Sequence, residues 1–341
     1  MNSKQSINLW YLCGMSLCNF DCAYCASGVP ERGGARTRTR EWITPEGLSR
    51  FNQILEWIPR QPYQIGVRLQ TVGEPLVSRD FLRGAARLSN EDNICFVELV
   101  TNGSLLRQRV PRLIGEFGAD PTGLCLWVTQ HFGEISTAEL IDQVCYARDQ
   151  GIGVVMNALL FPDNLAAVEE TVRVCQQQGL ELNIDLGQNF NNAYTALPFF
   201  PVLGDPNRSR LPQLGIDARA LQATLVAASA PRGLPCSAGH DYVHILMNGD
   251  VYPCRTYRSL GAPAKLGSAL DSDFVLRLRE QEYAPCEAAR ACICKEDFLH
   301  LQYAREPQRA ANRSLGIGYS GIADPAVDAE VAARLTRPGT Q

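Results

Sequence analysis

Three cysteines stand within eight residues near the start of the chain, at Cys18, Cys22 and Cys25. A tetrahedral zinc site usually takes four ligands from two paired arms, and no second paired arm stands nearby. Cysteine thiolates also hold iron–sulfur clusters, and a set of three leaves one iron without a protein ligand. The spacing therefore favours a cluster with an open coordination position, with a zinc site or a purely structural role as the alternative.

A second group of cysteines lies in the C-terminal third of the chain. It consists of Cys236, Cys254, Cys286, Cys292 and Cys294. Between the first two, an apolar run, an Asn-Gly turn and a return strand predict a β-hairpin that brings Cys236 and Cys254 together. The other five of the 13 cysteines are scattered through apolar segments, where small buried core residues are expected: Cys13, Cys95, Cys125, Cys145 and Cys175.

A repeated pattern of strand and helix follows the first cysteine group. Short apolar or β-branched runs begin at residues 65, 94, 124, 152 and 180, separated by roughly the thirty residues of one strand–helix unit. A predicted first strand at 7–12 and its helix at 44–58 add one more unit, which brings the total to six. Near-continuous apolar strands joined by helical crossovers predict an α/β fold with a parallel, helix-covered sheet, and six regular units favour a partial (β/α)6 TIM-type barrel.

The helix boundaries carry recognisable signals. The segment 136–139 reads Ser-Thr-Ala-Glu, a capping box, and Asp163, Ser78 and Ser104 are predicted to cap three other helices. Gly151 and Gly179 stand where two helices should end. These signals support the same alternation of strands and helices.

The first unit is about twice as long as the others, because the cysteine cluster is inserted after its strand. In α/β barrels the loops that follow the strands form the active face. The cysteines therefore occupy a position where chemistry is expected, and so do Thr129, Gln130, His131 and Asn157 near the ends of later strands.

Composition excludes several classes of protein. The 341 residues carry a net charge of −4 with interspersed signs, so the chain has no basic field that would attract nucleic acid or an anionic membrane. No apolar segment reaches about 18 residues, and no signal peptide is visible. An odd number of cysteines argues against a fully paired secreted scaffold. We expect a cytoplasmic protein that binds neither nucleic acid nor a membrane.

The segment CNFDCAYC at 18–25 resembles the CxxxCxxC motif of radical S-adenosylmethionine (radical SAM) enzymes. This resemblance implies a 4Fe-4S cluster on the three cysteines and S-adenosyl-L-methionine on its open iron. The segment TVGEP at 71–75 is similar to the family's GGEP loop, although Val72 replaces the first glycine. The implied cofactor contacts are Glu74, Gly73 and Pro75 for the methionine amino group, Asn102 of TNG near the ribose, and Tyr24 near the adenine.

The C-terminal region resembles the auxiliary-cluster extensions of that family, called SPASM and, in the shorter form, twitch. Gly249 to Cys254 matches their G-x4-C signature, while the full seven-cysteine pattern is absent. The resemblance implies a second 4Fe-4S cluster on Cys236, Cys254 and Cys286, with Cys292 or Cys294 as fourth ligand. The expected domains are a barrel at 1–187, a connecting segment with a helix at 188–235, the auxiliary subdomain at 236–300 and a tail at 301–341.

The resemblance fixes the type of reaction better than the substrate. It implies a 5'-deoxyadenosyl radical that abstracts hydrogen from a polar small molecule, such as a sugar, aminocyclitol or nucleoside. The chain is also loosely similar to dehydrogenases of aminoglycoside antibiotic pathways, in which His131 would act as the base. In an epimerase, Cys13 or a spare C-terminal thiol would return a hydrogen atom. A flavodoxin or ferredoxin is the expected reductant.

Three alternatives remain open at this point. The chain resembles peptide maturases of the SPASM type, but these often carry a leader-recognition domain ahead of the barrel, for which residues 1–6 leave no room. A radical enzyme that forms carbon–carbon bonds is another possibility. A noncatalytic iron–sulfur protein is the third, and a site with only three cysteines argues against it, since a carrier would prefer four protein ligands.

Overall fold

The computed structural model describes residues 5–15, 17–22, 24–25, 44–161, 163–186, 210, 214 and 231–288. The strands of the main sheet are β1 (Ser6–Cys13), β2 (Gln64–Thr71), β3 (Ile94–Thr101), β4 (Leu124–Gln130), β5 (Gly153–Leu160), β6 (Glu181–Leu186), β8 (Tyr242–Ile245), β9 (Asp250–Tyr252) and β10 (Gly267–Ser268). A small second sheet holds β7 (Pro235–Cys236) and β11 (Ala284–Pro285). The α-helices are α1 (Pro45–Trp57), α2 (Arg79–Ser89), α3 (Leu106–Pro111), α4 (Thr137–Asp149) and α5 (Leu165–Gln178). Shorter helical turns are η2 (Ile58–Arg60), η3 (Pro75–Val77), η4 (Arg112–Glu116), η5 (Pro121–Gly123), η8 (Arg255–Leu260) and η9 (Ala262–Ala264).

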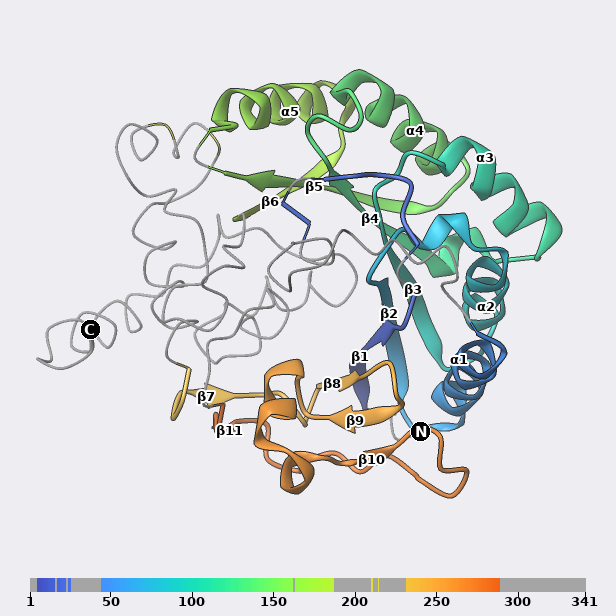
Figure 1. The fold of residues 1–341 in the computed structure, drawn as a ribbon, viewed down its shortest axis with the longest axis vertical. Helices are drawn as coiled ribbons and strands as arrows, with labels where there is room; N and C mark the ends of the chain where they lie inside the picture. Colours follow the sequence, from blue (N-terminus) through green and yellow to red (C-terminus); the bar gives the residue numbers. More distant parts are fainter. Residues whose placement is uncertain are drawn as a thin grey trace, which may run out of the picture.

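The first six strands form a parallel sheet in chain order. The complete order is β10-β9-β8-β1-β2-β3-β4-β5-β6, so each of β1 to β5 pairs with the strand that follows it in sequence. The sheet curves into an open arc with the helices outside it (Figure 1). No pairing joins β6 to β10, the two edges of the described sheet. The predicted α/β fold with a partial barrel of six parallel strands is confirmed, and the barrel is not closed.

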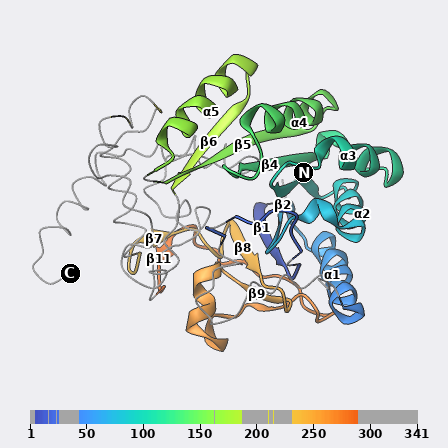
Figure 2. The ribbon, with the colours of Figure 1, turned by 45° about the horizontal axis from the view of Figure 1, so that its top comes forward.

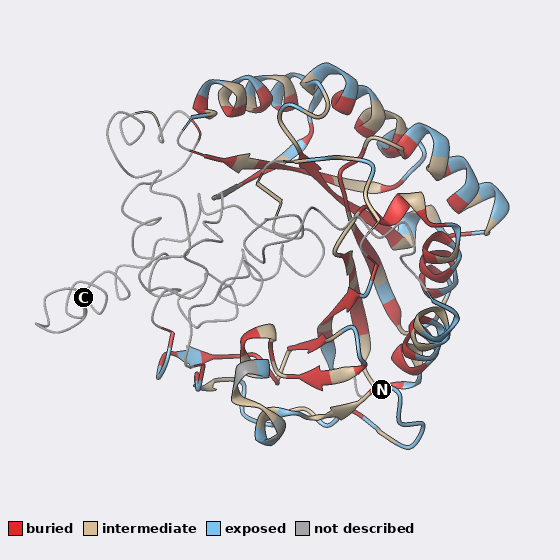
Figure 3. Cartoon of the chain, viewed as in Figure 1, coloured by how far each residue is buried: buried red, intermediate tan, exposed pale blue. Residues whose placement is uncertain are grey.

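The convex side of this sheet carries the main hydrophobic core. On β1, Ile7, Leu9 and Tyr11 alternate toward the helices and are at most 3% exposed. Alternation is the rule for strand side chains, so Trp10 and Leu12 face the concave side instead. Figure 3 shows the same division on the helices, whose buried residues face the sheet while their exposed residues face outward.

Most local helix signals act as predicted. Ser136 and Glu139 form a complete capping box on α4, Ser78 accepts from the backbone of Phe81 on α2, and Gly179 ends α5 with a left-handed φ of 61°. Each such side-chain cap stabilises a helix by about 1 kcal/mol. Two predicted caps are wrong. Helix α5 starts after Asn164 rather than Asp163, and α3 starts after Leu105 rather than Ser104.

The predicted hairpin in the cysteine-rich region is present as β8 and β9. Residues 246–249 form its turn, in which Gly249 has a φ of 86°. Because a β-carbon on Gly249 would meet the Leu270 side chain at 2.6 Å, both the backbone angle and the packing require glycine there. Figure 2 shows the hairpin beside β1.

Strand β8 pairs in parallel with β1, with Leu9 opposite Val243 and Tyr11 opposite Ile245. The hairpin therefore extends the barrel sheet, although the sequence suggested a separate small subdomain. The domain boundaries remain predictions, and the predicted helix at 217–229 and the tail at 301–341 lie outside the described residues. Among the described helices, none is long and apolar enough to cross a membrane.

Candidate active site

The cysteine cluster follows β1, at the end of the sheet where all six parallel strands terminate. The Cys25 amide donates to the Cys22 carbonyl at 3.1 Å, and the Phe20 amide approaches the Cys18 sulfur at 3.4 Å. Burial, Glu134 and the neighbouring Cys25 and Cys18 raise the pKa of the Cys22 thiol to about 12. The loop thus gathers three thiols whose negative charges would oppose one another, a conflict that bound cationic iron relieves.

Backbone hydrogen bonds attach the cysteine segment to the loop after β2. The Gly73 amide donates to the Met15 carbonyl at 3.0 Å, and the Glu74 amide donates to the Leu17 carbonyl at 2.8 Å. The predicted GGEP-like loop therefore lies directly against the residues that precede Cys18.

Glu74 is almost fully buried, with 1% of its surface exposed. Its carboxylate accepts hydrogen bonds from the Leu76 amide (2.9 Å), the Thr101 hydroxyl (2.6 Å) and the Asn102 amide (2.7 Å). Burial raises its pKa to about 7, opposed by these donors. Pro75 is the first residue of the helical turn η3 that Glu74 caps. The carboxylate thus joins two loops at the strand ends, and one lone pair of the four on its oxygens stays available for a further donor.

Asn19 links the cysteine loop to the loop after β3. The Asn102 side-chain amide donates to the side-chain carbonyl oxygen of Asn19 at 3.0 Å. The Asn19 side-chain amide in turn donates to the Ser104 hydroxyl at 2.9 Å. Gly103, between them, has a φ of 72°, and a β-carbon there would meet Val128 at 2.5 Å. The TNG segment therefore requires its glycine. Asn19 was not identified from the sequence, because a polar residue inside a cysteine loop gives no specific signal.

His131, directly after β4, reaches the cysteine loop. Its Nδ1 lies 3.1 Å from the Tyr24 hydroxyl and 3.4 Å from the Cys22 sulfur. The rings of Phe20 and Tyr24 contact the His131 ring at centroid distances of 6.0 and 5.9 Å. Burial lowers the pKa of the His131 imidazole to about 4. Phe161, which the sequence did not single out, packs on Tyr24 at 4.8 Å.

A row of polar side chains crosses the ends of β4, β5 and β6. Thr129, Asn157 and Asn183 stand opposite one another in register. The Asn157 amide approaches the Thr129 hydroxyl at 3.5 Å, and the Asn183 amide donates to the Asn157 carbonyl oxygen. Gln130 alternates to the other face and donates to the Ile135 carbonyl, so the structure does not bring it to this row. Asn183 is an addition to the predicted set.

Deeper on the concave face, aromatic and charged residues stack across neighbouring strands. Arg68 pairs with the carboxylate of Glu98 and lies over the rings of Trp10 (5.6 Å) and Trp127 (5.0 Å). Trp10 also contacts the His244 ring at 5.2 Å. His244, from β8, is fully buried, and burial together with nearby arginines keeps its pKa well below the usual value. The C-terminal hairpin therefore supplies one wall of this face, which the sequence did not reveal.

Several buried polar atoms of this face form no hydrogen bond with any residue that the structure describes. They are Trp10 Nε1 and both ring nitrogens of His244, together with Gln70 Oε1 and Asn183 Oδ1. An unpaired buried polar group costs about 1–3 kcal/mol, so such a set is expected where a ligand completes the bonding.

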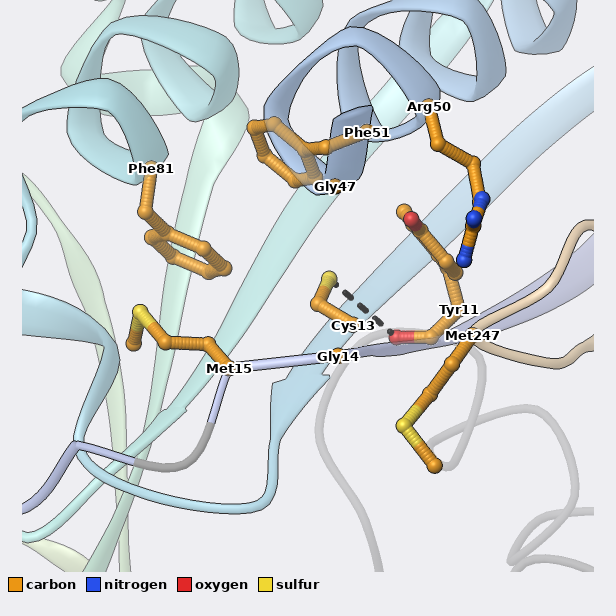
Figure 4. Close-up of a pocket in the computed structure, with 9 residues that line it drawn as sticks. All are labelled: Tyr11, Cys13, Gly14, Met15, Gly47, Arg50, Phe51, Phe81 and Met247. Carbon is orange, nitrogen blue, oxygen red and sulfur yellow. Dashed lines mark hydrogen bonds between the residues drawn. The ribbon is translucent and has the colours of Figure 1, made fainter. Parts of the chain in front are cut away.

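Cys13 lies on the opposite side of β1 from Trp10. It is 3% exposed and belongs to the core cluster between the sheet and α1 and α2. Figure 4 shows it near Phe51 and Phe81 of those helices. The structure does not bring this thiol together with His131 or the polar row.

The second cysteine group converges in part. Cys236, Cys254 and Cys286 are each at most 6% exposed, and β7 and β11 set Cys236 opposite Ala284. All three thiols lie near enough to the Tyr257 hydroxyl to raise its pKa, in addition to burial. Cys292 and Cys294 lie outside the described residues.

Neither group is arranged around a single ion: within the described ranges no set of three or more histidine, cysteine, aspartate or glutamate side chains could hold one. A four-iron cluster keeps its thiolates farther apart than one ion does, and its ligand set is cysteine. Each group instead brings three cysteine thiols close together. Cysteine thiolates are the ligands of iron–sulfur clusters, so both groups fit such a cluster.

Comparison with known proteins agrees with this chemistry. Residues 14–175 match the family model described as the Radical SAM superfamily. A solved structure of native anSMEcpe with bound AdoMet superposes with a TM-score of 0.50 at 12% identity, covering 96% of this chain and 97% of that one. A complex of BtrN with AdoMet and 2-DOIA superposes at 0.39 and 16% identity, covering 78% and 79%. No curated protein sequence matches. Residues 14–175 are thus similar to radical SAM domains, and the structural likeness concerns the fold alone.

Proposed function

We propose that the protein is a radical SAM enzyme that removes hydrogen from an uncharged, polar small molecule. The observation that carries this proposal is the assembly at the strand ends: Cys18, Cys22 and Cys25 lie in one loop, which is hydrogen-bonded to the loops of Glu74 and Asn102. Three loops distant in sequence are thus joined around the thiols. A purely structural cysteine site would not need this arrangement of buried carboxylate and amides.

The residues of this assembly have distinct proposed roles. The three thiolates hold a 4Fe-4S cluster, which, when bound, supplies the electron that splits S-adenosyl-L-methionine. Glu74 is held rigid by its three donors and accepts from the methionine amino group with its remaining lone pair. Asn102 stands beside the cysteine loop and binds the ribose, and Tyr24, within that loop, binds the adenine. Thr129 and Asn157 face the same space from β4 and β5.

The unpartnered atoms of the concave face support a polar, uncharged substrate. Trp10 offers a donor, and a neutral His244 offers one donor and one acceptor. The Arg68 guanidinium is neutralised by Glu98, so this pair presents no net charge to a ligand. A sugar ring, with hydroxyl groups that both donate and accept, has the complementary chemistry.

Dehydrogenation is the proposed outcome. With S-adenosyl-L-methionine bound, the site would supply an acceptor for one hydrogen atom from a substrate carbon. The substrate would then lose one proton and one electron to become a carbonyl compound. His131 is the candidate base, through Nε2. The electron acceptor is a second iron–sulfur cluster on Cys236, Cys254, Cys286 and either Cys292 or Cys294. Epimerisation through Cys13 has no support, because that thiol is on the helix side of β1.

The first experiment tests the reaction type. Anaerobic reconstitution is expected to give about eight irons per chain, the sum of two four-iron clusters, and dithionite is expected to yield 5'-deoxyadenosine from S-adenosylmethionine. Replacing Cys18, Cys22 and Cys25 together by Ala should abolish the cleavage, whereas Cys95→Ala, at an exposed cysteine, should not. A fully iron-loaded protein that forms no 5'-deoxyadenosine would contradict the proposal.

Two further measurements test the finer statements. Reduced flavodoxin or ferredoxin should replace dithionite, since one of them is the expected physiological donor. In turnover with substrate, solvent deuterium should not appear at the carbon that loses hydrogen, because a dehydrogenase does not return a hydrogen atom. Deuterium at that carbon would indicate an epimerase instead.

A further inference from the structure

A cavity of about 170 Å³ lies between the end of β1 and helices α1 and α2. It is on the convex side of the sheet, because Tyr11 and Cys13 line it while Trp10 and Leu12 alternate to the other face. Figure 4 shows Phe51 and Phe81 on its helix side and Met247, from the turn of the hairpin, on its opposite side. The cavity is thus separated by the sheet itself from the candidate active site.

One wall of the cavity is polar, and its groups have no partner among the residues that the structure describes. Tyr11 is 1% exposed, yet no hydrogen bond joins its hydroxyl to any described residue. Burial raises the pKa of the Tyr11 hydroxyl well above its usual value, and Arg50, on α1, lies close enough to oppose that rise. Arg50 forms no ion pair within the described part of the chain. Figure 4 shows the two side chains next to each other. A hydroxyl donor and an unneutralised guanidinium on the same wall are the elements of an anion site.

The remaining walls are apolar. Phe51, Phe81 and Met15 are each at most 4% exposed and line the cavity with ring and thioether surfaces. A dry cavity of about 150 Å³ is known to accommodate benzene, so the volume here suits a body the size of one six-membered ring. Such a body would fill the space that the side chains leave.

We propose that this cavity binds a small monocarboxylate with an apolar body of ring size, with its carboxylate on Arg50 and Tyr11. Inorganic phosphate would leave the apolar walls uncovered, and a plain hydrocarbon would leave the guanidinium and the hydroxyl unpaired. Only an amphipathic anion satisfies both walls. The inference is independent of the chemistry proposed for the cysteine loops, because no residue of those loops that binds iron or cofactor lines the cavity.

Calorimetric titration of the full-length protein with benzoate tests the site, and benzamide serves as the uncharged analogue of the same shape. Saturable binding of benzoate, tighter than that of benzamide, is expected. Arg50→Gln should weaken benzoate by at least about tenfold, since a charged hydrogen-bonding partner is lost, and should leave benzamide unchanged within about twofold. Tyr11→Phe, which keeps the ring, should weaken benzoate by about threefold to tenfold.

The matched control is Arg112→Gln, which removes one positive charge at an exposed position outside the cavity and should leave benzoate binding unchanged. If Tyr11→Phe proves unstable, Arg50→Gln still decides the matter, because Arg50 lies at the partly exposed side of the cavity. The proposal is overturned if benzoate shows no saturable binding up to about 10 mM, if benzamide binds equally well, or if Arg50→Gln binds benzoate like the unaltered protein.

Discussion

At the scale of single residues, Glu74 is the buried carboxylate on which the candidate site most depends. Three donors converge on it from two loops, so it acts structurally as well as in the proposed cofactor contact. In Glu74→Gln, one carboxylate oxygen becomes an amide that faces a donor, such as the Asn102 amide. We expect a loss of about 1–3 kcal/mol in the free energy of unfolding, together with weaker S-adenosylmethionine binding.

Urea denaturation and calorimetric titration with S-adenosylmethionine measure these two effects. Asp92→Asn, the same chemical change at an exposed position, is the control and should alter neither. A Glu74→Gln protein of unchanged stability would show that the three hydrogen bonds contribute little.

Two tryptophans distinguish a ligand-binding group from a structural one. Trp57 Nε1 donates to the Phe274 carbonyl at 2.8 Å, whereas Trp10 Nε1 has no partner in the described part of the chain. Trp57→Phe should therefore cost about 1 kcal/mol of stability or more, and Trp10→Phe should cost less or even stabilise the ligand-free protein. Substrate turnover should fall in Trp10→Phe and stay near normal in Trp57→Phe.

Thermal unfolding of the two variants, without and with substrate, makes this comparison. If Trp10→Phe is the less stable of the two and turns over substrate normally, Trp10 has a packing role and the concave face loses its support as the substrate site.

At the scale of elements, the turn between β8 and β9 depends on one glycine. Gly249→Ala would have to adopt a φ of 86° and displace the Leu270 side chain. We expect a loss of about 1–3 kcal/mol, because the strain and the steric contact act together. The control is Gly115→Ala, which meets nothing within 4 Å and should be neutral or slightly stabilising.

Circular dichroism melting of both variants provides the measurement. The result also bears on the second cysteine group, because Cys254 stands two residues after the end of β9: reconstituted Gly249→Ala should bind less iron. Equal melting temperatures for the two variants would contradict the requirement for glycine at the turn.

The elements also show which features were accessible from sequence. The six parallel strands were predictable because most are largely apolar runs with helix signals between them. The pairing of β8 with β1 was not, since the choice of a partner for an edge strand depends on contacts distant in sequence. His244 consequently gave no signal as part of the concave face. The placement of Cys13 was predictable in principle, because it has the same strand parity as the apolar Leu9 and Tyr11.

At the scale of the whole molecule, the C-terminal region and the barrel share one core. Val243, Ile245 and Val251 are fully buried in the same cluster as the residues of β1 and α1. The region also reaches round to α1 and η2, where the ring of Trp57 stacks on Phe274 at 5.5 Å. An auxiliary module that merely adjoined the barrel would not share its buried side chains in this way.

This continuity predicts a single cooperative unfolding transition for residues of both parts. In urea, tryptophan fluorescence, which reports on Trp10, Trp57 and Trp127 of the barrel, and exchange of the β8–β9 amides, which reports on the hairpin, should give the same midpoint within error. Both are measured on cluster-free protein, because bound metal would add its own transition. A hairpin that unfolds at lower urea than the barrel would mean that the interface on β1 is too weak to join them, and that a second cluster, rather than the shared core, must hold the C-terminal region in place.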